Sequence, residues 1–183
     1  MSVSSLPVRS PRWSLLAALA GGVMLLGAAK PWAHVRAAYF GGPWISIETP
    51  VNPYDNATRG ALLLVHTFHH GTPMDMPISG KAEGLVDGRR RSVAFTVDKS
   101  SHTGTYGVKR QWGDKGIWTL LITATPTEHM GSIQAVVDVG ADGAVERVDV
   151  PRTAQSMPRM LTAAEIERGL RERAKAPVAV GVR

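Results

Sequence analysis

The chain has 183 residues, contains no cysteine and carries a formal net charge of +6 at pH 7. Without cysteine there is no disulfide framework, no thiolate metal site and no cysteine nucleophile. The first 37 residues hold four basic residues and no acid, which leaves 17 basic against 15 acidic residues in the rest of the chain. With charges so nearly balanced, the net charge gives no reason to predict nucleic-acid binding, which requires a clustered basic face.

The N-terminal 37 residues have the pattern of a secretory signal peptide. Arg9 and Arg12 precede an uncharged apolar run at residues 13–29 that ends in Gly27-Ala28-Ala29, and Val35-Arg36-Ala37 follows as a plausible cleavage site. A basic start, a short apolar core and a small-residue exit are typical of such a peptide. Cleavage after Ala37 competes with cleavage near Ala29. The alternative is an uncleaved anchor at residues 13–29, although this run is shorter than the ~20 residues of a membrane span.

We therefore expect a periplasmic or secreted protein that contacts a membrane only through this segment, if it stays uncleaved. An exported domain without disulfides depends on its hydrophobic core, and the remaining residues are numerous enough to form one.

From residue 42 onward the sequence predicts short β-strands separated by turns. Polar and apolar residues alternate in most of them, as in strands with one buried face. The run at 61–69 is almost continuously apolar, which is typical of a central strand covered on both faces. The expected strands before residue 100 are 44–49, 61–69, 79–86 and 92–98.

The stretch 104–125 is predicted to be a β-hairpin around which the other strands are arranged. Tyr106 and Val108 share one face of its first strand, and Trp118 and Leu120 share one face of its second. The connection at 113–116 begins and ends with glycine, which suits a tight turn.

A second hairpin and a helix complete the predicted elements. Strands at 132–139 and 144–150 flank Ala141-Asp142-Gly143, a strong turn signal. After a linker, Thr162 and Glu165 form a capping box for a helix at 163–175. Its apolar stripe is narrow, so we expect a terminal helix that lies on the domain or is partly free, with a partner-docking helix as the alternative.

The expected fold class is all-β, an immunoglobulin-like sandwich of about seven or eight antiparallel strands. The predicted organisation is a signal peptide or anchor at 1–37, the sandwich at 42–151, and a linker, amphipathic helix and tail at 152–183.

One part of the chain resembles a known family. The pattern Gly104-Thr105-Tyr106, then Trp112, then Gly116-Ile117-Trp118-Thr119-Leu120 resembles the end of exported bacterial immunoglobulin-like modules of the YtkA-like and CopC-like type. The resemblance implies a tyrosine corner at Tyr106, whose hydroxyl would bond to nearby backbone. We expect Tyr106, Trp112 and Trp118 to be structural. Some of these modules are associated with copper, but their metal ligands have no residue-by-residue counterpart in this sequence.

The sequence contains no recognisable catalytic signature. It lacks the Gly-x-Ser-x-Gly elbow, the His-Glu-x-x-His zinc motif and a phosphate-binding glycine loop. We therefore expect no enzymatic activity and no obligatory cofactor.

The alternative is copper binding, because histidine and methionine residues gather in a few segments. Imidazole and thioether ligands suit copper in an oxidising compartment. If consecutive strands run in alternating directions, the loops that carry these residues all lie at one end of the sandwich. Such domains usually bind their ligands with the loops at one end. The candidate ligands are His69, His70, Met74, Met76, His102 and His129. His66 is interpreted as a core or strand-face residue, and the methionines can equally be apolar filler under a loop.

The function expected from the sequence is thus a non-catalytic binding or accessory module of the cell envelope, whose partner is an unidentified envelope protein or ligand. A periplasmic copper-binding protein is the alternative.

Overall fold

The computed structural model of the chain describes residues 42–126 and 131–175. The predicted signal peptide and the candidate ligand His129 lie outside these residues. Within the two described ranges, no helix is both long enough and apolar enough to cross a membrane.

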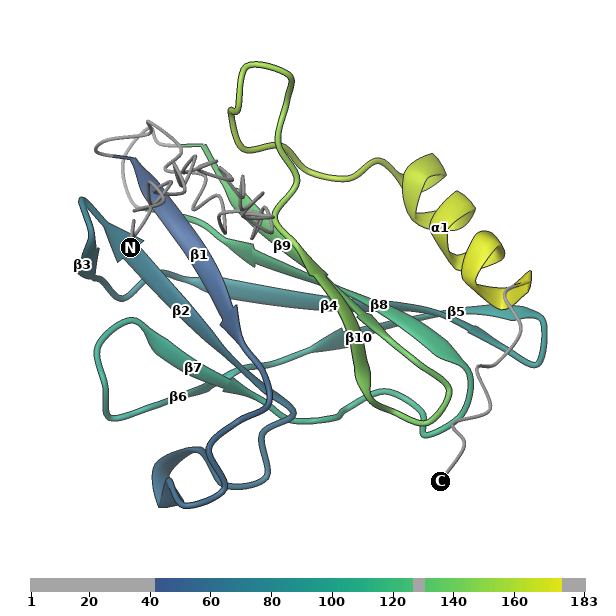
Figure 1. Ribbon diagram of the computed structural model, residues 1–183, viewed down its shortest axis with the longest axis horizontal. Coiled ribbons are helices and arrows are strands. Elements are labelled where there is room, and N and C mark those ends of the chain that lie inside the picture. The colour runs from purple at the N-terminus through teal and green to yellow at the C-terminus, as the bar shows by residue number, and fades with distance from the viewer. Residues whose placement is uncertain (1–41, 127–130, 176–183) are drawn as a thin grey trace, which may run out of the picture. The chain divides into compact units, whose positions relative to one another are not determined.

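The fold is mostly β and sandwich-like, with two antiparallel five-stranded sheets and one C-terminal helix (Figure 1). In the first sheet the strand order is β1-β2-β7-β6, with β3 paired to β2. In the second sheet the order is β10-β9-β8-β4-β5. The first sheet comprises β1 (Pro43–Glu48), β2 (Leu63–His69), β3 (Thr72–Pro73), β6 (Asp98–Lys99) and β7 (Thr105–Val108). The second comprises β4 (Ile78–Val86), β5 (Arg89–Phe95), β8 (Ile117–Ala124), β9 (Ile133–Val139) and β10 (Val145–Asp149).

Most strand predictions are confirmed to within a few residues. A turn at Asp87-Gly88 joins β4 to β5, with φ of 49° and 73° at its two residues. Positive φ at both positions is the geometry that a two-residue hairpin prefers. The hairpin of β9 and β10 is also confirmed, and Gly143 has the positive φ of 83° that its turn requires.

The predicted hairpin at 104–125 is wrong. β7 pairs with β2 and β6 in one sheet, whereas β8 pairs with β4 and β9 in the other. Residues 109–116 cross between the sheets, and Trp112 is buried on the way, 5.4 Å from the ring of Phe95. Alternation correctly predicted that β7 and β8 each have a buried face. These faces lie on opposite sides of the same core, so the two strands do not pair with each other.

The core lies between the two sheets, and glycines on β4 make room for large aromatic rings. A Cβ built on Gly80 would lie 2.2 Å from the ring of Phe95, and one built on Gly84 would lie 2.4 Å from the ring of Trp118. Trp118 and Trp112 are 3% and 5% exposed. The two tryptophans are thus part of the packed interior.

Tyr106 is buried in this core, and its hydroxyl is fully used. It donates to the carbonyl oxygen of Met76 and accepts from the Met76 amide, both at 2.8 Å. The partner is 30 residues upstream. The tyrosine corner of antibody-type domains instead bonds to backbone a few residues away. Tyr106 therefore joins β7 to the segment that enters β4, which lies in the other sheet.

Replacing Tyr106 with phenylalanine is expected to lower the free energy of unfolding by about 1–2 kcal/mol, because both buried backbone groups of Met76 would lose their partner. Urea denaturation followed by tryptophan fluorescence measures this change. Tyr54→Phe is the control, since Tyr54 is 90% exposed. Equal midpoints for the two variants would contradict the role of the Tyr106 hydroxyl.

The C-terminal helix α1 (Ala163–Lys175) packs on the outer face of the second sheet. Ile166 and Leu170 lie against Leu121 and Val136, and Leu161 covers the same small cluster. The predicted capping box is confirmed: the Thr162 amide donates to Oε2 of Glu165 at 2.8 Å, and the Glu165 amide donates to Oγ1 of Thr162 at 3.3 Å. The described helix is therefore docked on its own domain.

The docking of α1 should weaken in acid. Hydrogen bonds from Arg159, and then from the backbone and side chain of Thr162, lower the pKa of Glu165 from 4.5 to about 2. A carboxylate whose pKa is depressed in the folded state stabilises it above its unfolded pKa, and this contribution disappears as the pH falls through the folded pKa. We expect amide hydrogen exchange of α1, corrected for intrinsic rates, to accelerate from pH 4.5 towards 2.

The matched variants are Glu165→Gln and Glu172→Gln on the same helix. Glu165→Gln should remove most of the pH dependence of α1 in this window, whereas Glu172→Gln should retain it. Identical pH profiles of the two variants would contradict the assignment to Glu165.

Candidate functional site

Three loop regions converge at one end of the described domain. The Thr67 amide donates to the Gly104 carbonyl at 2.8 Å, and the Met74 amide donates to the Thr67 carbonyl at 3.0 Å. At the end of β8, the Thr125 amide donates to the Pro77 carbonyl at 3.0 Å. The β2–β3 hairpin and the β6–β7 loop consequently lie together on the left of Figure 1.

His69 and His70 form a pair of touching imidazoles at this end. Their ring centroids are 4.1 Å apart with an edge-on angle of 64°. His69 closes the hairpin opposite Thr72, and His70 occupies the turn with φ of 51°. His70 is exposed and His69 is half-buried. The sharp turn thus presents two ring edges together at the surface.

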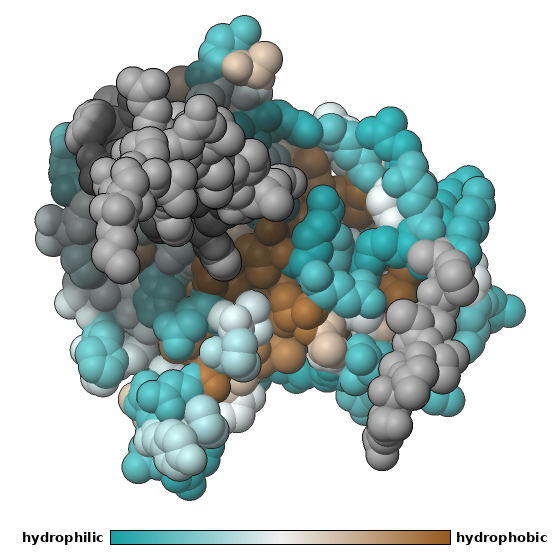
Figure 2. Space-filling view, in the orientation of Figure 1, coloured by the Kyte–Doolittle hydropathy of each residue, from teal (hydrophilic) through white to brown (hydrophobic). Residues whose placement is uncertain are grey.

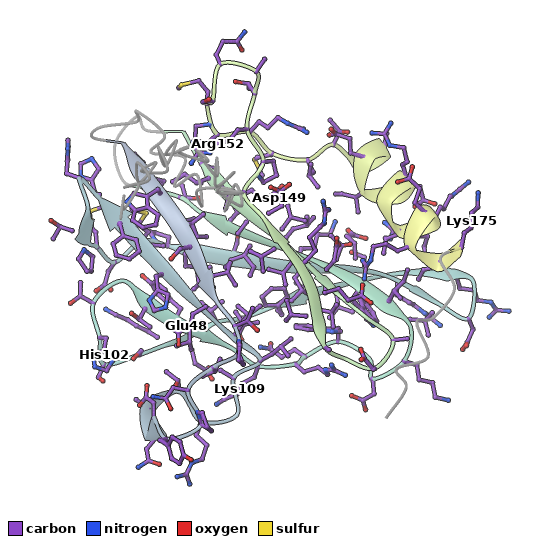
Figure 3. All side chains as sticks on the ribbon, in the orientation of Figure 1. Glu48, His102, Lys109, Asp149, Arg152 and Lys175 are labelled. Carbon is purple, nitrogen blue, oxygen red and sulfur yellow. The ribbon has the colours of Figure 1, made fainter. Side chains whose placement is uncertain are left out.

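The other predicted ligands have different surroundings. Met76 is 3% exposed and belongs to the hydrophobic core, and Met74 is half-buried and packs against the same core. His102 is exposed in the β6–β7 loop, with Nδ1 3.3 Å from Oγ of Ser100; Figure 3 labels it. Within the part of the chain that the structure describes, no three His, Cys, Asp or Glu side chains are close enough to hold a metal. The metal site stays a prediction, for which the described residues bring only His69 and His70 together.

Asp75 holds the two loops of this end in register. Its carboxylate accepts from Nζ of Lys99 at 2.6 Å and from the Gly104 amide at 2.7 Å. The hydrogen bond from Lys99, followed by the one from Gly104, lowers the pKa of Asp75. An ionised Asp75 therefore fixes the β3–β4 connection against the loop that carries His102.

An aromatic pair, which the sequence analysis did not predict, lies on the outer face of the first sheet. The rings of Trp44 and Phe68 stack with centroids 4.1 Å apart and an interplanar angle of 11°. The two residues are directly opposite each other on β1 and β2. Trp44 is 39% exposed, whereas its neighbour Ile45 is 3% exposed and faces the core. Alternation within β1 left the exposure of Trp44 undecided, and finding the pair required the register between the strands.

His66 lies beside this pair on the same face. Its Nε2 is 2.9 Å from Oε2 of Glu48, and its Nδ1 is 3.3 Å from Oγ1 of Thr105. A hydroxyl, an imidazole and a carboxylate in series are the parts of a nucleophilic triad, yet Thr105 is only 8% exposed. These contacts join β1, β2 and β7 across the sheet, so we interpret them as structural.

These residues lie on the outer face of β1 and β2 and in the turn at which β2 ends, and we treat them as one candidate surface. We call it the aromatic–histidine surface, and it comprises Trp44, His66, Phe68, His69 and His70. Comparison with known proteins gives no match to any protein-family model, curated protein or solved structure. The function must therefore be argued from this surface.

Proposed function

We propose that the protein is an exported, non-catalytic, immunoglobulin-like binding or accessory module of the cell envelope. Its partner binds the aromatic–histidine surface. The observation that carries this proposal is the stacked Trp44–Phe68 pair, with Trp44 39% exposed on the outer face of the first sheet. Aromatic residues are enriched in protein interfaces, and truncating them is often costly for binding.

Three further features support the proposal. The two packed antiparallel sheets are compatible with an immunoglobulin-like sandwich. The convergence of loops at the end that carries His69 and His70 matches the usual position of binding loops in such domains. The N-terminal sequence pattern supports export.

Export is tested with the full chain carrying a C-terminal tag. Cell fractionation and mass spectrometry of the N-terminus should find the protein outside the cytoplasm, beginning near residue 38 or near residue 30. A cytoplasmic protein that still begins at Met1 would overturn this part of the proposal.

Binding is tested by placing a photo-crosslinking amino acid at position 44 in cells. The matched control is position 148 on β10, because Val148 is also 39% exposed but belongs to the other sheet. We expect a discrete adduct from position 44 that disappears in Phe68→Ala and is absent from position 148. No adduct at position 44, or the same adduct from both positions, would contradict a partner at the aromatic–histidine surface.

Copper binding is the second candidate, and the 4.1 Å contact of the His69 and His70 rings favours it. Imidazole is a ligand type that suits copper in an oxidising compartment, and the turn brings two imidazoles together. Titration of the purified protein with Cu(II) and Cu(I) tests the idea. We expect micromolar or tighter binding that is lost in His69→Ala/His70→Ala and kept in His66→Ala. Weaker binding, or binding that survives the double substitution, would remove this candidate.

A further inference from the structure

A groove separates α1 from the outer face of β9 and β10. Its cavity has a volume of about 330 Å³, at the lower end of the roughly 300–1,000 Å³ that small-molecule sites occupy. Leu161, Ile166 and Val136 contribute apolar walls. Figure 2 shows apolar atoms between the hydrophilic surfaces of α1 and β10. The groove and the aromatic–histidine surface belong to different sheets, because β9 and β10 lie in the second sheet and β1 and β2 in the first. Figure 3 labels Lys175 at the end of α1, on the right.

Gly169 keeps this groove open at its helical wall. It lies in the middle of α1, where glycine destabilises a helix relative to alanine. A Cβ built on Gly169 would have no atom within 4 Å, so close packing does not require glycine. Gly169 lines the cavity. A glycine that weakens the helix without being required by packing is explained if a ligand occupies the space beside it.

The charges around the groove leave one carboxylate without a partner. Asp138 pairs with Arg147 and Arg173 at 2.9 and 3.0 Å. Glu146 pairs with Arg173 at 3.0 Å, and Glu165 pairs with Arg159 at 2.8 Å.

Glu172 also lines the cavity and is exposed at its rim. Among the ion pairs of the described residues, none includes Glu172. Among the carboxylates that line the cavity in the described part of the chain, Glu172 is therefore the one without an ion-pair partner, and it lies beside an apolar wall.

We propose that this groove is a binding site for a small cationic amphiphile. The apolar part of such a ligand lies along Leu161, Ile166 and the open position at Gly169, and its amine or guanidine pairs with Glu172. This inference is independent of the aromatic–histidine surface and of copper binding.

The test uses three probes of matched length: hexylamine, hexanol and hexanoate. Isotopically labelled full-length protein is titrated with each probe while the NMR signals of Thr119, Val136 and Gly169 are followed. We expect saturable shifts with hexylamine, at least tenfold weaker binding of hexanol, and no saturation with hexanoate. No saturation with any probe, or equal binding of hexylamine and hexanoate, would overturn the proposal.

Substitutions on α1 then locate the site. Gly169→Leu fills the groove and should weaken hexylamine binding at least tenfold. Ala164→Leu adds the same bulk at an exposed helix position that does not line the cavity, and should bind normally. Far-UV circular dichroism verifies that both variants keep α1. Equal affinities of the two variants would place the probe elsewhere.

A charge reversal keeps the proposal testable if Gly169→Leu does not fold. Glu172→Lys changes an exposed side chain and should reverse the preference, so that hexanoate binds and hexylamine does not. Hexanol binding should stay unchanged. An unaltered preference for hexylamine would show that Glu172 does not recognise the cation.

Discussion

Asp138→Ala is expected to destabilise the domain by about 3 kcal/mol, because it would strip two arginines of their shared counter-charge. The Asp138 side chain is 5% exposed and accepts from Oγ1 of Thr119 at 2.7 Å, Nε of Arg147 at 2.9 Å and Nη1 of Arg173 at 3.0 Å. Removing one partner of a buried ion pair typically costs about 3–5 kcal/mol. We expect the lower end, since Glu146 still accepts from Arg173.

Urea denaturation followed by tryptophan fluorescence measures the effect. Two further variants serve as an exposed control and as a test of coupling between Asp138 and Arg173. Asp114→Ala removes a carboxylate whose side chain is 92% exposed and should change stability by no more than about 0.5 kcal/mol. Asp138→Ala/Arg173→Ala should cost less than the sum of the single changes, because the two residues act on each other. Strict additivity would show that the Asp138–Arg173 pair contributes no coupling energy.

The same network explains why α1 is docked, which the sequence left undecided. The narrow stripe of Ile166, Leu170 and Ala174 left open whether the helix lies on the domain, is partly free or docks on a partner. Arg173, however, also donates to the carbonyl oxygens of Trp118 and Val139 at 3.1 and 2.8 Å. A charged residue near a helix end is normally interpreted as solvent-exposed, and its partners are 34 and 55 residues away. No local pattern predicts such a contact.

Local signals predicted the elements well. The described helix runs from Ala163 to Lys175, and the capping box predicted its start. β9 and β10 follow the predicted ranges because alternation and a glycine turn are encoded within a few residues. What local signals could not predict is strand pairing, and β7 shows why. Its neighbour β2 is distant in sequence, and only the shared core selects it over β8.

In the candidate site, too, the sequence predicted some features and could not predict those that depend on residues distant in the chain. The topology argument brought the loops of His69 and His102 to one end because it needed only alternating strand directions. It could not tell that Met76 belongs to the core, because the hydroxyl of Tyr106 fixes the Met76 backbone from 30 residues away. It also could not find the Trp44–Phe68 stack, which depends on the register of β1 against β2.

The close approach of two backbones at Gly104 leads to the second large expected effect. Gly104→Ala should lower the free energy of unfolding by about 3–4 kcal/mol, combining left-handed backbone strain with overpacking. Gly104 has φ of +68°, and its Cβ would lie 2.5 Å from the carbonyl oxygen of Thr67 and 2.9 Å from the amide nitrogen of Met74. Both atoms belong to the backbone, so no side chain can rotate away. Because the loops of His69 and His102 meet here, their amides should also exchange faster with solvent.

Gly88→Ala separates the two contributions. Gly88 has a similar φ of +73°, but a Cβ there meets no atom within 4 Å. Its substitution should therefore cost only the conformational strain, about 1–2 kcal/mol. The difference between the two variants, measured by urea denaturation, gives the cost of separating the backbone of Gly104 from those of Thr67 and Met74. If the two substitutions are equally destabilising, this contact does not hold the loops of the candidate site together.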